Sequence, residues 1–320
     1  MTTPGKYRHL TQCSTTAGHF TILAIDHRDN LLERLNQHAP APLSDGQFSA
    51  FKQQVMSHLL PAASAVLTDP ESGLGPGIAQ GTISGQKGLL SPLEVTDYSV
   101  HSGRRQTNFI PGWSVGKIKR IGAAGVKLLL YYHPDADNAP EQREIVRRLV
   151  EDCARHDIPF FLEPIAYSRD PDIHLDNNEL RQVVVESARI FTGMGIDVLK
   201  VQFPSDAKQE QDESVWHAAL EELDNACGTT PWALLSAGVD YETFRRQAEL
   251  ACKAGASGVI VGRAVWAEAV SLQGDAREMF LATTAHQRMD ELASICAASG
   301  RSWREKVTPP DVASGWYERY

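Results

Sequence analysis

The sequence predicts an α/β protein that folds as a single (β/α)8 TIM barrel with short N- and C-terminal extensions. Eight short apolar runs alternate with longer amphipathic segments, which is typical of repeated βα units. The runs are almost continuously hydrophobic, as in a parallel sheet that is packed on both faces. No G-x-G-x-x-G motif follows any run, which disfavours a doubly wound open sheet. We expect one domain over residues 1–320, with a barrel core at about 20–270 and a C-terminal helix and tail at 271–320.

The order of the apolar runs gives the expected strands. They lie at 20–26, 64–69, 88–94, 125–132, 159–165, 197–203, 232–238 and 258–263. Four segments between them have apolar residues at every third or fourth position and predict helices. These segments are 141–157, 178–195, 213–227 and 241–255.

Two regions have an irregular composition. The stretch 70–86 after the second run is rich in glycine, so we expect a flexible or close-approach loop. The tail 302–320 is expected to be an irregular extension packed on the barrel. Its aromatic residues offer apolar surface for that packing or for a subunit contact, so a homo-oligomer is one expectation. They are Trp303, Trp316, Tyr317 and Tyr320.

Composition restricts the class of partner. A net charge of −9 argues against nucleic acid, whose phosphate backbone is bound by basic surfaces. The five cysteines are widely scattered, without the close pairs of zinc or redox motifs, so we expect reduced, mostly buried thiols. No apolar run approaches the roughly 20 residues of a membrane helix, and the first residues do not resemble a secretory signal. We therefore expect a cytoplasmic protein without a membrane partner.

In a (β/α)8 barrel, chemistry takes place at the C-terminal ends of the strands. Charged residues end or interrupt six of the eight runs: Asp26, Asp69, Glu94, Lys127, Glu163 and Lys200. Lys127, Glu163 and Lys200 are 36 and 37 residues apart, which is about one βα unit. We expect them on adjacent strands at comparable heights. If all three share the inward phase of their strands, two lysines and a carboxylate project into one cavity.

Each of these residues has a structural explanation when taken alone. A strand lysine is commonly salt-bridged, and Asp26 or Asp69 could cap the helix that follows. Several charged groups in one buried space are costly, however, and favour a functional site. Burial and a neighbouring cation would depress the pKa of Lys200 and free its amine to attack a ketone. Glu163 could then move protons during Schiff-base chemistry, and neither a metal nor a cofactor is needed.

The last two strands predict a phosphate site. Ser236, Ala237 and Gly238 lie at the end of the seventh run, and Gly262 and Arg263 lie at the end of the eighth. Backbone N–H groups of such glycine-bearing loops and of a helix start attract phosphate, and an arginine adds bidentate hydrogen bonds. The alternative is that both glycines only make tight turns and that the arginine is a solvated surface residue.

Seven segments together resemble the class I tagatose 1,6-bisphosphate aldolase family. The similarity runs in order over roughly residues 20 to 270, and the family also has relatives that cleave 6-deoxy-6-sulfofructose 1-phosphate. The segments are DHRDNLL (26–32), LTDPESG (67–73), GVKLLLYYHPDAD (125–137), PFFLEPIAY (159–167), DVLKVQFP (197–204), LLSAGVD (234–240) and GASGVIVGRAVW (255–266).

The resemblance implies a (β/α)8 barrel that reversibly splits a ketose phosphate into dihydroxyacetone phosphate and an aldehyde, which is glyceraldehyde 3-phosphate for tagatose 1,6-bisphosphate. Lys200 stands where the family has its Schiff-base lysine, Glu163 where it has the acid/base carboxylate, and Lys127 where it has a second active-site lysine. Asp26 matches the aspartate that ends the first strand and would hydrogen-bond substrate or intermediate.

The resemblance also assigns the two ends of the substrate. Arg28 would contact the end far from the ketone. The family usually reads Asp-Gln-Arg at the first strand, whereas His27 stands here in the middle position, where it could alter affinity for the distal group or turn into the loop. The family's lysine-containing segment after the third strand is replaced by 94–105. Ser236, Gly238, Gly262 and Arg263 fall on the C1-phosphate site.

Three other readings use some of the same residues. A metal-dependent aldolase needs histidine or carboxylate ligands that converge on one metal ion. Candidate ligands are His27, His133 and the acidic segment 170–176, but their spacing does not match a metal motif. Another phosphate-binding barrel would share the site after the last two strands but would not need two buried lysines. A non-catalytic regulatory protein could bind a sugar phosphate on the same scaffold.

Overall fold

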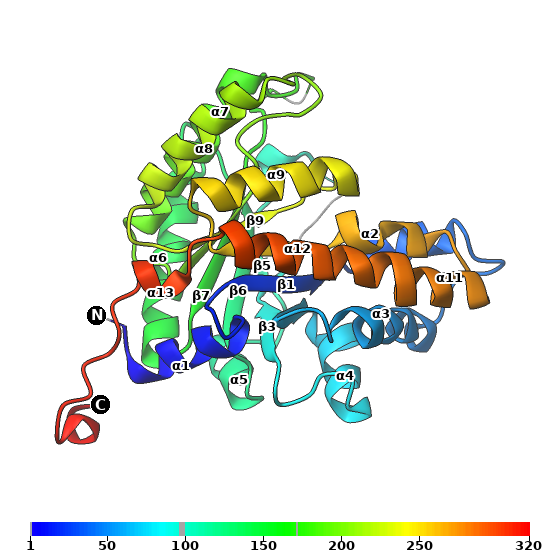
Figure 1. The fold of residues 1–320 in the computed structure, drawn as a ribbon, viewed down its shortest axis with the longest axis horizontal. Helices are drawn as coiled ribbons and strands as arrows, with labels where there is room; N and C mark the ends of the chain where they lie inside the picture. Colours follow the sequence, from blue (N-terminus) through cyan, green and yellow to red (C-terminus); the bar gives the residue numbers. More distant parts are fainter. Residues whose placement is uncertain (1, 96–99, 171) are drawn as a thin grey trace.

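A computed structural model describes residues 2–95, 100–170 and 172–320. Eight parallel strands close a barrel in the order β1-β10-β9-β8-β7-β6-β3-β2, with helices around it (Figure 1). The predicted fold class and all eight predicted strands are confirmed. The barrel strands are β1 (Phe20–Ile25), β2 (Ala65–Thr68), β3 (Gly88–Pro92), β6 (Gly125–Tyr131), β7 (Phe160–Ile165), β8 (Val198–Val201), β9 (Trp232–Leu235) and β10 (Gly258–Val261). A short antiparallel pair, β4 (Glu94–Val95) and β5 (Asn108–Phe109), was not predicted.

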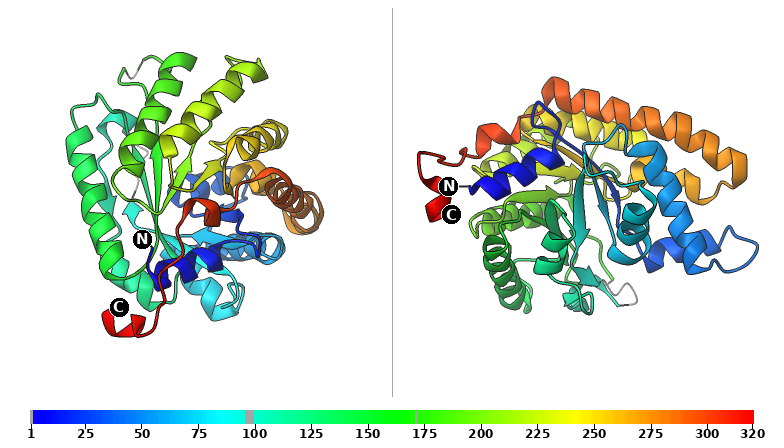
Figure 2. Two further views of the ribbon diagram at one scale, coloured as in Figure 1. Left: turned by 60° about the vertical axis from the view of Figure 1, so that its left-hand side comes forward. Right: turned by 90° about the horizontal axis from the view of Figure 1, so that it is seen from below.

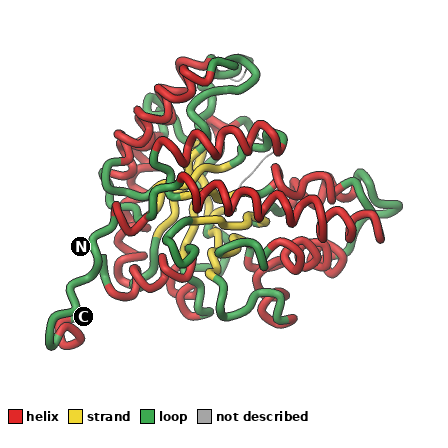
Figure 3. Tube along the Cα trace, in the orientation of Figure 1, coloured by secondary structure: helices red, strands yellow, loops and turns green. Residues whose placement is uncertain are grey.

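Helices connect the strands and form the outer layer of the molecule (Figure 3). The four predicted helices are confirmed as α6 to α9, and aspartates Asp176, Asp212 and Asp240 cap the starts of α7, α8 and α9. The α-helices are α1 (Pro4–Cys13), α2 (Asp29–Asn36), α3 (Asp45–Leu59), α4 (Gly75–Gln80), α5 (Val115–Arg120), α6 (Ala139–Arg155), α7 (Asn177–Thr192), α8 (Glu213–Cys227), α9 (Tyr241–Ala254), α10 (Arg263–Trp266), α11 (Gly274–Phe280), α12 (His286–Ser299) and α13 (Trp303–Lys306). Short π and 3-10 turns lie at η1 (Pro70–Leu74), η2 (Ser102–Arg104), η3 (Ala267–Val270), η4 (Leu281–Ala285) and η5 (Trp316–Arg319).

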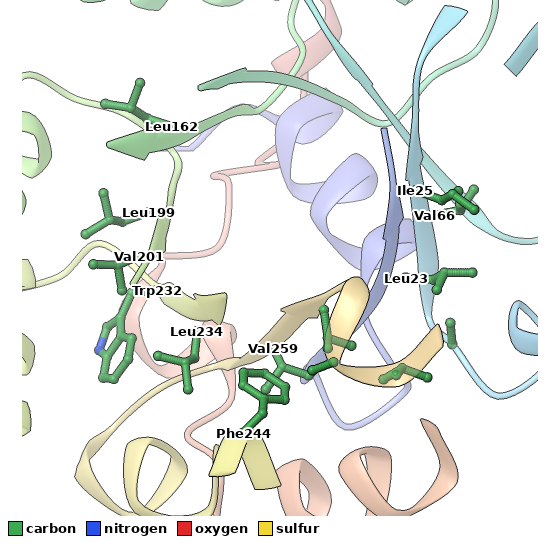
Figure 4. Close-up of a cluster of buried hydrophobic side chains, with 14 of the residues drawn as sticks. Leu23, Ile25, Val66, Leu162, Leu199, Val201, Trp232, Leu234, Phe244 and Val259 are labelled. Atoms are coloured by element: carbon green, nitrogen blue, oxygen red, sulfur yellow. The ribbon is translucent and has the colours of Figure 1, made fainter. Parts of the chain in front are cut away.

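Side chains alternate between the two faces of each strand. Leu23, Ile25, Leu199 and Val201 point outward and belong to the apolar layer between the strands and the helices (Figure 4). Residues that point inward fill the barrel interior near the N-terminal ends of the strands. Among them are Phe20, Ile22, Phe161, Val198 and Ile260. The next inward positions on several strands are polar, so the apolar plug forms the floor of a polar cavity.

The helix α1 closes the barrel at the N-terminal ends of the strands (Figure 2). Leu10 and Cys13 of this helix are fully buried and belong to the interior apolar cluster. Lys6 forms an ion pair of 2.7 Å with Asp197, which directly precedes β8. Trp303, at the start of α13, is also completely buried against this cluster. The helix therefore holds the N-terminal strand ends together, far from the ends where chemistry is expected.

The first part of the glycine-rich stretch after β2, residues 70–80, is helical, which corrects the prediction of a loop there, whereas 81–86 form turns and loop as expected. Asp69 accepts hydrogen bonds from the backbone N–H groups of Glu71 and Ser72 and thereby starts the π turn η1, which continues into α4. The predicted close approach is confirmed, because a Cβ atom on Gly73 would lie 1.8 Å from the hydroxyl oxygen of Thr68. Glycine is needed here for close packing rather than for flexibility.

The C-terminal tail only partly follows the expectation. Trp303 packs into the core, whereas Tyr317 and Tyr320 remain 67% and 64% exposed. Within the described residues, no helix has both the length and the apolar character needed to cross a membrane.

Candidate active site

A cavity of about 390 Å³ opens at the C-terminal ends of the strands. All of the predicted site residues line it except Gly238: these are Asp26, His27, Arg28, Lys127, Glu163, Lys200, Ser236, Ala237, Gly262 and Arg263. Gly238 lies beside the cavity, where a Cβ atom would come within 3.2 Å of the Arg263 guanidinium. The absence of a side chain at Gly238 makes room for Arg263, and its predicted contact with phosphate stays a prediction.

Lys200 and Glu163 meet at the floor of this cavity. The Lys200 ammonium donates a hydrogen bond of 2.9 Å to Glu163 Oε2, and the Lys127 ammonium lies 3.0 Å from the same oxygen. All three side chains point inward, as the strand phase requires, and all three are buried. The predicted convergence of two lysines and one carboxylate is confirmed.

The strands carry these residues with an offset that the sequence did not reveal. Lys127 is paired with Phe161, two residues before Glu163, whereas Leu129 is the partner of Glu163. The expectation of comparable heights is therefore wrong for Lys127. Its long side chain spans the offset and brings the ammonium to the level of the carboxylate.

Lys127 is the centre of a buried charge cluster. Its ammonium donates hydrogen bonds of 2.9 Å to Asp26 and 2.8 Å to Glu94, in addition to its contact with Glu163. Burial alone would lower the pKa of Lys127, but the three carboxylates raise it well above its usual value. Lys127 therefore stays charged and acts as the shared cation of the site.

Asp26 is held as a carboxylate by this cluster. Burial would raise its pKa, but Lys127, Lys200 and His27 together hold the pKa well below the usual range. Asp26 thus contacts Lys127 and does not cap the following helix, for which no capping side chain is found. Asp69, by contrast, is structural, because it caps η1 and pairs with the buried Lys52.

The loops after β9 and β10 form the wall opposite Glu94. Ser236 to Val239 make a turn in which the Val239 N–H donates to the Ser236 carbonyl oxygen, and Ala237 and Gly238 have φ values of +47° and +83°. Left-handed backbone at a non-glycine residue costs about 1 kcal/mol or more and is concentrated at functional sites. Gly262 is required by close packing, since a Cβ atom would lie 2.8 Å from the Ala24 carbonyl oxygen.

His27 faces the β10 side of the cavity. Its ring packs edge-on against Trp266 at 5.4 Å, and its Cε1 would lie 3.4 Å from a Cβ atom on Gly262. It therefore lies beside the loops predicted to bind the C1 phosphate. This position does not favour the expected effect of His27 on affinity for the other end of the substrate. Burial, opposed by Asp26 and reinforced by Arg263, lowers the pKa of His27 to about 3. The imidazole is neutral at physiological pH.

In His27→Gln, the free energy of unfolding is expected to fall less on acidification than it does in the wild type. Because the folded-state pKa of His27 is below its usual value near 6.5, the unfolded chain binds the extra proton first, and stability is lost as pH falls from about 6.5 toward 3. Urea unfolding of both proteins at several pH values in this window measures the effect. Parallel curves for wild type and variant would contradict it.

Four polar residues that line the cavity had no predicted role: Asn30, Glu94, Tyr131 and Gln202. Tyr131 and Gln202 share the inward phase of Lys127 and Lys200, so strand alternation could have identified them. Glu94 ends its strand run but was given no function. Arg28 donates a hydrogen bond of 2.5 Å to the Glu94 carbonyl oxygen, which joins the β1 and β3 loops.

The segment 94–108 is only partly within the described residues, since 96–99 lie outside them. In its described part, the Arg105 guanidinium stacks on the ring of Tyr131 at 4.2 Å. Because Tyr131 lines the cavity, the segment contributes to the site at least through this stacking.

The metal-dependent reading finds no matching geometry. Among the residues that the structure describes, no group of three or more His, Cys, Asp or Glu side chains is arranged to hold a metal ion. The carboxylates of Asp26, Glu94 and Glu163 instead surround the Lys127 ammonium.

Comparison with known proteins gives the family. Residues 20–268 match the model of the DeoC/LacD family aldolases. The chain belongs to this family. Tagatose 1,6-diphosphate aldolase 2 of Streptococcus agalactiae serotype III is 32% identical, with 95% of this chain and 99% of the relative aligned. Tagatose 1,6-diphosphate aldolase 1 of Streptococcus pyogenes serotype M1 is 31% identical, with 96% and 100% aligned.

Solved structures show the same fold. An archaeal fructose 1,6-bisphosphate aldolase superimposes with a TM-score of 0.62 at 18% identity, covering 92% of this chain and 99% of that one. A Schiff-base-forming fructose 1,6-bisphosphate aldolase gives the same TM-score at 18% identity, covering 91% and 99%. As a DeoC/LacD family member, the protein is an aldolase, a lyase that acts on a carbon–carbon bond, and the resemblance found in the sequence is confirmed.

Proposed function

We propose that this aldolase is a class I enzyme that reversibly cleaves tagatose 1,6-bisphosphate into dihydroxyacetone phosphate and glyceraldehyde 3-phosphate through a Schiff base on Lys200. The observation that carries the proposal is the buried Lys200 ammonium at the cavity floor, 2.9 Å from Glu163, with a second lysine on the same carboxylate oxygen. A buried amine with a carboxylate that can take its proton is what imine formation requires.

The reaction follows from this pair of residues. Lys200 passes a proton to Glu163 and its neutral amine adds to the C2 carbonyl carbon of the ketose. The resulting carbinolamine loses water with a proton returned by Glu163, which leaves a cationic imine and a carboxylate. The carboxylate then removes the C4 hydroxyl proton, the C3–C4 bond breaks, and its electrons form an enamine on Lys200 while the aldehyde leaves. Protonation at C3 and hydrolysis release dihydroxyacetone phosphate.

Lys127 and Asp26 support these steps by electrostatics. The Lys127 ammonium, 3.0 Å from Glu163, stabilises the carboxylate form that must act as the base. Asp26 is ionised and lines the cavity, so it can accept a hydrogen bond from a substrate hydroxyl and can stabilise the cationic imine.

The C1 phosphate is proposed to bind between the loops after β9 and β10. The strained turn at Ala237, the close packing at Gly262 and the Arg263 guanidinium all lie on this wall of the cavity. An arginine beside closely packed backbone suits a phosphate dianion.

Arg263→Ala is expected to raise KM about 10- to 100-fold with a smaller change in kcat, because hydrogen bonds to a charged group contribute about 1.5–3 kcal/mol. Steady-state kinetics measure both constants. Arg246→Ala is the matched control, because Arg246 lies on the outer helix α9 in an exposed ion pair with Glu213. A fall in kcat at unchanged KM would contradict the assignment.

Substrate choice is tested by comparing turnover of tagatose 1,6-bisphosphate, fructose 1,6-bisphosphate and 6-deoxy-6-sulfofructose 1-phosphate.

The chemistry is tested by borohydride reduction in the presence of dihydroxyacetone phosphate, followed by peptide mass spectrometry. An adduct on Lys200 is expected. Binding without an adduct would favour a non-catalytic sugar-phosphate protein, and loss of activity in EDTA would favour a metal-dependent aldolase.

A further inference from the structure

Among the described residues, Glu94 is the member of the charge cluster that has a fully buried carboxyl oxygen without a hydrogen-bond partner. Its Oε1 accepts a hydrogen bond of 2.8 Å from Lys127. Its Oε2 is buried and has no hydrogen-bond partner among the described residues, although the side chain lines the cavity and is 3% exposed. A buried carboxylate oxygen without a donor is costly, whereas a carboxylic acid O–H can direct its proton into the cavity.

The charges in the cluster also favour one more proton. Asp26, Glu94 and Glu163 would carry three negative charges when ionised, against two positive charges on Lys127 and Lys200, which leaves a net charge of −1 in a buried space. One proton on a carboxyl group makes the cluster neutral. A buried group tends to take up a proton rather than keep an uncompensated charge.

The surroundings indicate which carboxyl group holds this proton. Glu163 accepts from two ammonium groups through one oxygen, and Asp26 is surrounded by Lys127, Lys200 and His27. The carboxyl group of Glu94 faces one cation, Lys127, and one anion, Asp26. Arg28 reaches only the backbone carbonyl oxygen of Glu94. Burial raises the pKa of Glu94, and the contact with Lys127 does not fully offset the effect.

We propose that Glu94 is a neutral carboxylic acid in the active enzyme and that its Oε2–H donates a hydrogen bond to the substrate oxygen that becomes the aldehyde oxygen. This inference rests on the proposed aldol chemistry. Glu163 takes the C4 hydroxyl proton, and Glu94 stabilises the negative charge that develops on the same oxygen while the C3–C4 bond breaks. Glu94 does not need to transfer its proton, because a neutral acid placed beside a developing oxyanion acts as a hydrogen-bond donor.

The first test compares two replacements of Glu94. Glu94→Gln keeps a neutral donor of the same shape, so a loss in kcat of about fivefold is expected, whereas Glu94→Ala removes the donor and should lower kcat about 10²- to 10³-fold. Asp26→Asn is the matched comparison, because Asp26, like Glu94, contacts the Lys127 ammonium but is ionised. It should lose much more activity than Glu94→Gln. Equal losses in Glu94→Gln and Glu94→Ala, or in Glu94→Gln and Asp26→Asn, would overturn the proposal.

The second test does not depend on turnover. A difference infrared spectrum of wild type minus Glu94→Gln at neutral pH is expected to show the carbonyl stretch of a protonated carboxyl group. A difference that contains only ionised carboxylate bands would overturn the proposal. Failure of borohydride trapping in the wild type would instead reject the Schiff-base function and would leave the infrared result standing.

Discussion

Lys200→Ala is expected to lower the rate of cleavage by about 10⁴-fold or more, because its amine forms the imine whose nitrogen accepts the electrons of the breaking carbon–carbon bond. The substitution should leave the fold intact. Glu163 keeps its ion pair with Lys127 at 3.0 Å, so no buried carboxylate loses its last cation. Activity is therefore lost for chemical rather than structural reasons.

The measurement is kcat for the best substrate, together with the mass of the protein after borohydride reduction with dihydroxyacetone phosphate. Lys253→Ala is the matched control, because Lys253 is exposed on α9 and pairs only with Glu249 on the same helix. The control should keep both turnover and adduct. Unchanged turnover in Lys200→Ala would end the Schiff-base proposal.

Lys127→Met is expected to destabilise the protein by about 3–5 kcal/mol at pH 7, since it leaves buried carboxylates without their shared cation. The effect should shrink as pH falls. In the variant, burial favours protonation of the remaining carboxylates, so they take up protons on mild acidification and the repulsion between Asp26 and Glu163 disappears. In the wild type, the depressed pKa of Asp26 contributes stability that is lost only in strong acid.

Urea unfolding at pH 7.5 and pH 5 measures this difference. Lys200→Ala is the comparison, because Lys200 has one carboxylate partner in the cluster and Lys127 has three, so its loss should be smaller. A loss of stability in Lys127→Met that is the same at both pH values would show that the three carboxylates do not depend on this ammonium.

The strands were predictable because each is a short apolar run whose burial is nearly complete. The inward phase of Lys200 was also accessible, because alternation along β8 places Val198 and Lys200 on one face. The offset of Lys127 was not accessible, since it depends on how β6 pairs with β7. The helical start at Pro70 depends on the Asp69 cap, which the sequence offered only as an alternative, because the glycine-rich composition of the segment that follows favours a loop.

The site divides in the same way. Residues at strand ends were identified because topology brings such ends together, whatever the details of packing. The space that Gly238 leaves for Arg263 could not be predicted, because it depends on where the Arg263 side chain lies, and the phosphate contact of Gly238 stays a prediction. Glu94 was noticed but not interpreted, because its state depends on one oxygen without a partner and on the charges around it, which come from distant parts of the chain.

The helix that closes the barrel floor also fixes where the two ends of the polypeptide emerge. Both termini lie on the same side of the molecule (Figure 1), and the Tyr320 hydroxyl sits so close to Gly5 that a Cβ atom there would be 2.6 Å away. The cavity opens at the other ends of the strands. An affinity tag, a fusion partner or a solid support attached through either terminus would therefore leave the route by which substrate enters unobstructed.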